Sequence, residues 1–405
     1  GVTVTKPLSN AWTLSSVSGY TDTKTDRPSV DNASGGRIDE VEFSQEFLAT
    51  YDDGEGAEAV FGLFALSNDT DDDRDQQRPW ESSERQDRRQ SETENLSLFG
   101  EVRWDVSESW RLVLGGRFDY EETDFSAVSR RVEAGSVLSS SSSAASSDFD
   151  AFLPKAGAIY EFSENASLGF TVQKAHRAGG SAVNNVTGEP YGYDPENAWN
   201  YELSWKRRSP EGAYLFALNA FLMDWQDQQI NVPQVPGDFT SDIVLNAGES
   251  RVYGLEAEVS ARPVKGLQLA AGLGLAKTEF QEFSFVQFGS LLDLAGEPFP
   301  QAPELSASVS ADYTFAEGWF VGGDLAHTDS ALSRSILEGG PRDEMPSYTI
   351  ANLRGGWRKP GWDVVLFVDN AFDKDYFLYR YDTPGFQLAT MGQSRSYGVQ
   401  ATWRY

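Results

Sequence analysis

Cysteine is absent from this 405-residue sequence, and histidine occurs only twice, at His176 and His327. Without cysteine the chain has no disulfides, no thiolate metal sites and no cysteine nucleophile. Two histidines far apart in the sequence exclude a histidine-rich metal site. We therefore predict no metal-binding residues and no cofactor.

Long hydrophobic runs are also missing, and the mean hydropathy is −0.45. A transmembrane helix needs a run of about 18 or more apolar residues, so an α-helical membrane protein is excluded. A membrane β-barrel is not excluded, because its strands alternate and the average hides their apolar face.

Positive charge is scarce, with 33 Lys and Arg against 62 Asp and Glu and a formal net charge of −29. This balance excludes a generic nucleic-acid binder, which needs a basic face for phosphates. Hydrophobic residues make up 40% and aromatic residues 13%, so the chain is not simply disordered. Length alone would suggest roughly two or three soluble domains.

The residues that are present alternate with the period of a β-strand. In the last segment, Tyr397, Val399, Ala401, Trp403 and Tyr405 share one face, while Ser396, Gln400, Thr402 and Arg404 share the other. The same division recurs at 96–105 and at 305–313. A soluble β-sandwich shows such alternation too, so the connections must separate the two architectures.

Short and long connections alternate strictly along the chain. Short turns with Gly, Pro, Asn or Ser occur at 8–11, 52–56, 106–109, 163–166, 209–212, 263–266, 316–318 and 359–361. Long polar connections of roughly 18 to 28 residues, uncommon in compact domains, run through 21–40, 68–93, 122–148, 175–197, 226–250, 279–303, 329–346 and 374–394.

This rhythm predicts an all-β fold, a transmembrane antiparallel meander β-barrel with short periplasmic turns and long extracellular loops. The segments number about seventeen, and an odd count that opens at Gly1 without a signal sequence suggests a missing N-terminal part. Lipid requires the apolar face outside and the charged face around the lumen. Seven tryptophans fall near strand ends, where amphipathic rings prefer the interface: Trp12, Trp104, Trp110, Trp319, Trp357, Trp362 and Trp403. The alternative is that they are sandwich-core residues.

Several stretches resemble the TonB-dependent receptors, outer-membrane active transporters of Gram-negative bacteria, and occur in that family's order. The most specific are Pro195-Glu196, Asn246-Ala-Gly248 and Asn370-Ala-Phe-Asp-Lys374 with Tyr376. Others lie at 13–20, 43–48, 61–64, 98–102, 114–118, 152–155, 176–180, 200–203, 224–230, 253–256, 296–303 and 346–349.

The resemblance implies a receptor with a TonB box, a plug and a 22-stranded barrel, of which residues 1–405 would be the C-terminal barrel part. Plug, box and about five strands would precede it, and Tyr405 stands where the family usually ends in Phe. The implied function is TonB-energised uptake of a scarce nutrient, most commonly a ferric siderophore. The implied partners are outer-membrane lipid, lipopolysaccharide, TonB and a small metal chelate, with no nucleic acid and a monomeric state.

Alternatives remain within and outside this class. The same receptor class also takes up cobalamin, haem and saccharides. A passive porin would use its charged inner face for selectivity, and a soluble all-β binding protein would need no detergent. None of these readings makes the chain an enzyme, and we predict no catalytic residues.

Ligand-binding candidates lie in the long connections. A ring cluster at Phe280, Phe283, Phe285 and Phe288 would either stack on a ligand or pack on itself. Other candidates for the same vestibule are Trp80, Arg177, Tyr191, Tyr193, Tyr379, Arg380 and Tyr381.

Two polar segments receive plainer interpretations. Residues 69–75 begin like a calcium loop but have Arg74 and Trp80 where an EF-hand needs Gly and Glu, which favours a solvated loop. The Ser- and Ala-rich segment 136–147 predicts a mobile loop tip.

The acidic composition of the long connections also bears on the cargo. Acidic loops mildly disfavour strongly anionic cargo, although loop charge does not fix pocket charge.

Overall fold

The computed structural model describes residues 1–27, 34–77, 82–184, 186–187, 189–235, 241–287, 289–333, 343–383 and 386–404. Trp80 and Phe288 therefore lie outside the described residues. Within these ranges the chain is built from strands and turns, and it has no helix long and apolar enough to cross a membrane.

Seventeen strands belong to one sheet, which confirms the predicted number. They are β1 Val2–Pro7, β2 Trp12–Arg27, β3 Ser34–Asp52, β4 Ala57–Gln77, β5 Glu84–Ser107, β6 Trp110–Glu133, β7 Ser136–Ser163, β8 Ala166–Arg177, β11 Glu196–Arg208, β12 Tyr214–Pro233, β13 Asp242–Ala261, β14 Leu267–Glu282, β17 Leu305–Thr314, β18 Trp319–Thr328, β21 Tyr348–Lys359, β22 Trp362–Asp369 and β25 Ser396–Trp403.

Eight shorter strands form four two-stranded hairpins within the remaining connections. These pairs are β9 Gly180–Val183 with β10 Pro190–Tyr193, β15 Ser284–Gln287 with β16 Ser290–Asp293, β19 Ala331–Leu332 with β20 Glu344–Met345, and β23 Phe377–Thr383 with β24 Phe386–Met391.

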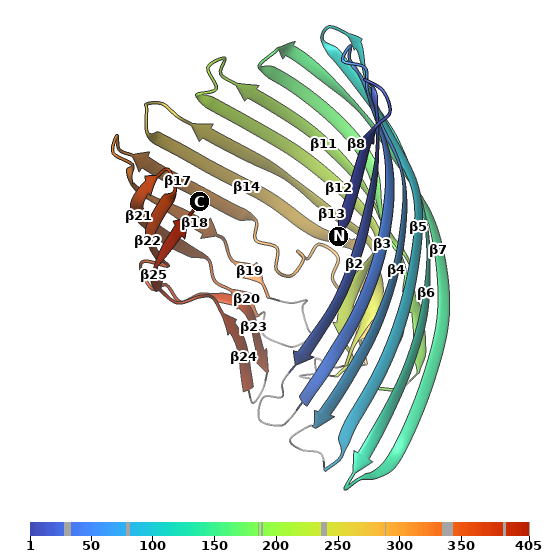
Figure 1. Ribbon diagram of the computed structural model, residues 1–405. Coiled ribbons are helices and arrows are strands. Elements are labelled where there is room, and N and C mark those ends of the chain that lie inside the picture. The colour runs from blue at the N-terminus through green and yellow to red at the C-terminus, as the bar shows by residue number, and fades with distance from the viewer. Residues whose placement is uncertain are drawn as a thin grey trace. The chain divides into compact units, whose positions relative to one another are not determined.

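The chain divides into two compact units. Unit 1 comprises Gly1–Gly157, Gln173–Trp199 and Gln226–Ala247, and unit 2 comprises Ala158–Val172, Asn200–Trp225 and Gly248–Tyr405. In unit 1, β1 to β6 pair antiparallel in chain order, and Figure 1 shows the long strands of this run side by side. In unit 2, β13, β14, β17, β18, β21, β22 and β25 pair in the same way. Each unit is therefore an antiparallel meander, as predicted.

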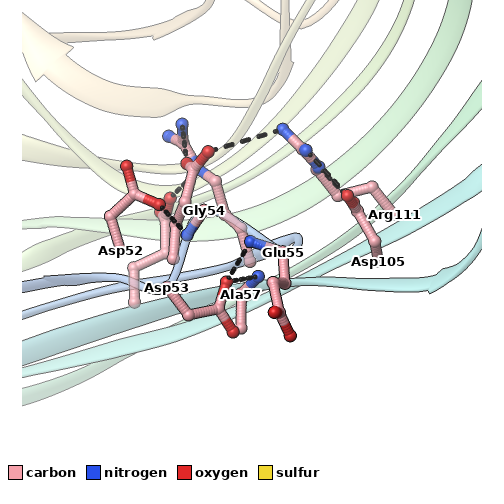
Figure 2. Close-up of polar contacts among 10 residues, drawn as sticks. Asp52, Asp53, Gly54, Glu55, Ala57, Asp105 and Arg111 are labelled. Carbon is pink, nitrogen blue, oxygen red and sulfur yellow. Dashed lines mark hydrogen bonds and ion pairs between the residues drawn. The ribbon is translucent and has the colours of Figure 1, made fainter. Parts of the chain in front are cut away.

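All eight predicted short turns separate consecutive sheet strands. Figure 2 shows the turn between β3 and β4, where the Asp53 carboxylate accepts hydrogen bonds from the N–H groups of Glu55 at 2.7 Å and Ala57 at 3.0 Å. Gly54 takes a φ of 70°, a region that suits glycine, and its N–H donates to Asp52. These side-chain acceptors satisfy donors that a tight reversal leaves without ladder partners.

The two faces of the strands differ as a membrane requires. On β5, Leu96, Leu98, Val102 and Trp104 are exposed on one face, which we call the outer face. The opposite, inner face carries ionic groups such as Glu101, which accepts a hydrogen bond from the Lys155 ammonium at 2.7 Å. The apolar stretch of β5 covers about nine residues, close to the ~9–11 that a tilted transmembrane strand needs.

Most of the seven tryptophans at strand ends have exposed rings, and several lie in pairs. Trp362 stacks on Trp403 with ring centroids 5.9 Å apart, and Trp319 lies 6.3 Å from Trp357. Trp12 contacts Tyr51 across the β2–β3 ladder. Rings that pair across the ladder at strand ends and face outward fit an interfacial aromatic belt better than a sandwich core.

The first three long connections differ from the prediction, because they are mainly strand. The β4–β5 and β5–β6 ladders continue without interruption far beyond the apolar stretch, and β7 has 28 residues. Segment 69–75 thus lies within β4 rather than in a loop, and the Ser-rich segment 136–147 lies in β7 rather than at a loop tip. Above the lipid both faces of a strand are polar, so the hydrophobic alternation disappears while backbone pairing continues.

We expect Asp53→Ala to lower thermal stability at neutral pH, because the turn loses its acceptor for two N–H groups. The N–H donors of Ala57 and Glu55 lower the pKa of the Asp53 carboxylate. Its stabilising effect is therefore present above the ordinary carboxyl pKa of about 3.9 and is lost as the pH falls through the lowered value.

Melting temperatures of the parent and Asp53→Ala should converge in acid, and Asp53→Asn, which keeps an acceptor oxygen, should lose less. A difference that persists unchanged at the lowest pH would contradict this assignment.

Candidate ligand-binding site

Three of the predicted residues lie on neighbouring elements of unit 1, at the end of β8 and on the β9–β10 hairpin that follows. Arg177 is the last residue of β8, and Tyr191 and Tyr193 lie on β10 with ring centroids 6.5 Å apart. Gly180 pairs with Tyr193, and a Cβ on this glycine would lie 2.4 Å from the tyrosine hydroxyl oxygen. Because Gly180 has no Cβ, β9 can lie close against the ring of Tyr193.

The hairpin is anchored by a side chain that the sequence interpretation did not single out as functional, Asn246. Its carbonyl oxygen accepts the N–H of Asp194 at 2.9 Å, and its amide donates to the carbonyl oxygens of Asp194 and Asp227 at 2.9 and 2.7 Å. Asp227 has a φ of 55°, which turns its carbonyl away from the regular ladder. Asn246 therefore joins three segments that are distant in sequence.

Glu196 and Gln229 complete this anchor. The Gln229 N–H donates to the Glu196 carboxylate at 2.6 Å, and its side-chain amide donates to the Ala178 carbonyl at 2.8 Å. Glu196 is 5% exposed, and its other oxygen lies 3.7 Å from the Arg177 guanidinium. A buried carboxylate thus pairs with the guanidinium of an otherwise exposed arginine. The family-like motifs at 195–196, 224–230 and 246–248 therefore have a structural role.

A pocket of about 410 Å³ lies beside Arg177 on the inner face of the β5–β7 strands. It is lined by His176, Arg177, Arg117, Asp119, Glu121 and Asn95, among others. Arg117 donates to Asp119 at 2.8 Å and to the Ser97 hydroxyl at 2.7 Å, and His176 Nδ1 lies 3.2 Å from Asn197 Oδ1. The pocket therefore offers fixed hydrogen-bonding groups of both charges.

Tyr191 adds a protonated phenol to this region. Its hydroxyl oxygen accepts the N–H of Val244 at 2.9 Å, which leaves its own O–H available as a donor. Burial raises the pKa of the Tyr191 phenol, and the charge of Arg89 acts in the opposite direction. Arg89, which the sequence interpretation also missed, is thus near enough to influence Tyr191.

The predicted phenylalanine cluster in unit 2 packs on itself. Phe280, Phe283 and Phe285 are 0%, 4% and 8% exposed, with successive ring centroids 5.3 and 4.9 Å apart. Phe280 also contacts Phe299 at 4.7 Å, and the Phe299 N–H donates to the Thr278 hydroxyl. These rings form the apolar core of the β14–β17 connection, so a stacking role for them would require rearrangement and stays a prediction.

The last group of predicted residues lies on β23 in unit 2. The Arg380 N–H donates to the Ser333 hydroxyl at 2.8 Å, and its guanidinium lies 5.6 Å from the Phe377 ring centroid. Tyr379 and Tyr381 pair with Thr390 and Leu388 in the β23–β24 ladder. The side chain of Tyr381 lies outside the described residues.

The near-terminal motif at 370–374 also has a structural role. Asn370 is buried, with a φ of 47°, and its amide donates to the carbonyl oxygens of Lys374 and Gln393 at 2.9 and 3.0 Å. Tyr376 stacks on Tyr348 at 4.4 Å. Among the described residues, no three His, Asp or Glu side chains lie together in a way that could hold a metal ion.

An antiparallel meander of seventeen strands, with an outward apolar face and short turns at one end, defines an outer-membrane β-barrel. The chain belongs to the family described as TonB dependent receptor-like, beta-barrel, whose profile matches residues 1–371. The protein is therefore located in the outer membrane of a Gram-negative bacterium. The short turns face the periplasm, and the long β-hairpins that extend beyond the apolar stretch lie outside the cell.

Named relatives are receptors. The metal-pseudopaline receptor CntO of Pseudomonas aeruginosa is 25% identical over 323 residues, which cover 79% of this chain and 42% of that protein. The ferric-pyoverdine M114 receptor PbuA of Pseudomonas sp. is 25% identical over 288 residues, covering 68% and 32%. The chain thus spans less than half the length of these curated relatives.

Solved structures share the fold at lower identity. The ferric yersiniabactin uptake receptor FyuA from Yersinia pestis superposes with a TM-score of 0.82 at 17% identity, over 99% of this chain and 60% of that one. The ferric citrate transporter FecA gives a TM-score of 0.70 at 17% identity, with the same coverage of both chains.

We expect Asn246→Ala to loosen the β9–β10 hairpin without unfolding the sheet. The change leaves the Asp194 N–H and the Asp227 carbonyl without this partner, while the Asp194 carbonyl keeps the Gln229 amide at 3.2 Å, and we expect a loss of about 1–3 kcal/mol in local stability. Hydrogen exchange should show about tenfold or greater loss of protection at 180–194.

The control is Asn10→Ala in the exposed β1–β2 turn, which should leave protection at 180–194 unchanged. Equal protection in parent and Asn246→Ala would contradict the anchoring role.

Proposed function

We propose that residues 1–405 form part of the barrel domain of a TonB-energised outer-membrane receptor that takes up a metal chelate, with a ferric siderophore as the first choice. The observation that supports the proposal is a pocket of about 410 Å³ on the inner face, lined by Arg177 and Gly179, next to the β10 strand that carries Tyr191 and Tyr193. The site lies where the strands pass from the apolar stretch into the extracellular hairpins, so a ligand would meet it from outside.

The relatives support this class of cargo, since the named ones are receptors for metal chelates of pseudopaline and pyoverdine. Binding would use the Arg177 guanidinium for anionic oxygens and the tyrosine rings for stacking. Tyr379, Arg380 and the buried phenylalanines stay in the proposal as secondary candidates. It assigns the chain no enzymatic activity.

The remaining partners follow from the class. TonB would transmit energy from the inner membrane, and the exposed outer-face residues such as Leu98 and Leu114 would contact outer-membrane lipid and lipopolysaccharide. A single barrel needs no second copy to cover its outer face, so we propose a monomer.

The test is uptake of radiolabelled iron chelates in a Gram-negative strain that lacks its own siderophore receptors. We expect uptake that requires TonB. We also expect Arg177→Gln to weaken chelate binding by about tenfold, equivalent to about 1.4 kcal/mol.

Arg37→Gln on the outer face of β3, an exposed arginine paired with Asp39 at 2.8 Å, is the matched control and should bind normally. Uptake that continues without TonB would favour a passive channel, and the absence of any chelate binding would overturn the proposal.

A further inference from the structure

One edge of β7 extends beyond the strand that follows it. β7 has 28 residues and lies between β6 and β8 in the sheet, whereas β8 has only 12 residues and begins directly after the short turn at 163–166. Among the described strands, residues 136–147 at the far end of β7 therefore have only β6 as a neighbour. The β9–β10 hairpin forms a sheet of its own, and the segment before it passes beside Phe149, since a Cβ on Gly179 would lie 2.8 Å from that ring.

This segment, which we call the β7 edge, lacks the side chains that usually protect a free strand. Charged residues and prolines on an edge keep other chains from pairing with it. Residues 136–147 contain no charged residue and no proline, although charged residues make up 23% of the chain. Most of them are Ser or Ala, whose small side chains let another backbone approach, and residues 136–142 are all exposed. The β7 edge is therefore open to pairing with an extended peptide.

A pocket of about 740 Å³ borders the same strand. Residues 144–146 of β7 form one side of it, and its other lining residues include a row of acids across three strands. Asp69 on β4 lies opposite Glu92 on β5, which lies opposite Asp124 on β6. Glu92 has the same parity as the exposed Leu96, and no register shift intervenes, so the acidic row lies on the outer face.

The acidic row favours a positively charged partner. Like charges directly opposite each other destabilise a sheet. No basic residue lines the pocket, and within the described part of the chain the three carboxylates form no ion pair. Arg88, on the same face of β5, is engaged with Asp73 at 3.1 Å and with Asp75 at 2.9 Å. A cationic side chain that enters the pocket would reduce the repulsion within the row.

We propose that the β7 edge binds an extended cationic peptide segment, which adds to the sheet as a further strand and directs Lys or Arg side chains over residues 144–146 toward Asp124. The added strand would lie about 10 Å from β6, two strand spacings away, which the two side chains can span together. Backbone hydrogen bonds supply affinity, and the acidic row supplies the preference for positive charge. The interaction uses the outer face and does not depend on chelate uptake.

Other occupants fit the β7 edge less well. Two copies of the chain in one membrane point the same way, so their β7 strands could pair only in parallel, the less stable arrangement. A second copy would also bring its own acidic row close to this one, and lipid phosphates carry the same sign as the row. A peptide has neither restriction.

The test uses the full-length protein, purified in detergent micelles without lipopolysaccharide, and a short peptide of alternating Thr and Lys. Hydrogen exchange at 136–147 should slow when the peptide binds, because free N–H groups gain acceptors. Residues 86–92 of β5, which is paired on both edges, should show no change. The same peptide with methylated backbone nitrogens keeps its charges but cannot donate, and it should bind at least about tenfold more weakly.

The acidic row is tested by Glu92→Gln and Asp124→Asn, which should each weaken peptide binding by about threefold or more. Added salt should weaken binding to the parent. The matched control is Asp22→Asn, an exposed aspartate on β2, which should leave the affinity within about 1.5-fold of the parent. Because the two row variants remove like-charge repulsion, their melting temperatures should equal or exceed that of the parent.

Three results would overturn the inference. The first is equal binding of the methylated and unmethylated peptides, and the second is parental affinity in both row variants. The third is exchange at 136–147 that the peptide does not change, as expected if a second copy already covers the edge. None of these results bears on the proposed uptake function, which is tested separately at Arg177.

Discussion

The requirement that every backbone N–H and C=O group find a partner inside a lipid bilayer is the constraint on which this structure depends. Lipid offers no hydrogen bonds, so the chain must cross as paired strands, and pairing forces successive side chains onto opposite faces. Leu96, Leu98 and Val102 then meet lipid while Glu101 and Lys155 form an ion pair on the other face. The same alternation of side chains between the two faces continues where the strands extend beyond the apolar stretch.

The ladders of β3 to β6 extend beyond the apolar stretch, and their parity continues to sort side chains where no lipid demands it. The result is a wall whose outer face carries the acidic residues Asp69, Asp71 and Asp73 and whose inner face carries both arginines and acidic residues. A net charge of −29 for the chain therefore says little about the ligand site. At Tyr191, for example, burial raises the pKa of the phenol, and the nearby charges of Arg89 and Asp242 act in opposite directions.

The family-like motifs that identified the chain most specifically hold together the segments around the candidate site. Asn246, Gln229 and Glu196 fasten the ends of β11, β12 and β13 to the segment that follows Arg177. Asn370 likewise anchors the base of the β23–β24 hairpin, because its amide donates to the carbonyl oxygens of Lys374 and Gln393.

The sequence alone determined the strand number, the short turns, the two faces and the family, because period-two alternation and turn residues are local properties. It misjudged segments 69–75 and 136–147, since strands that are wet on both faces lose the alternation that reveals them. The burial of Phe280, Phe283 and Phe285 and the pairing of Arg177 with Glu196 were decided by tertiary structure. Each depends on contacts between residues distant in sequence and on a register that only the paired strands define.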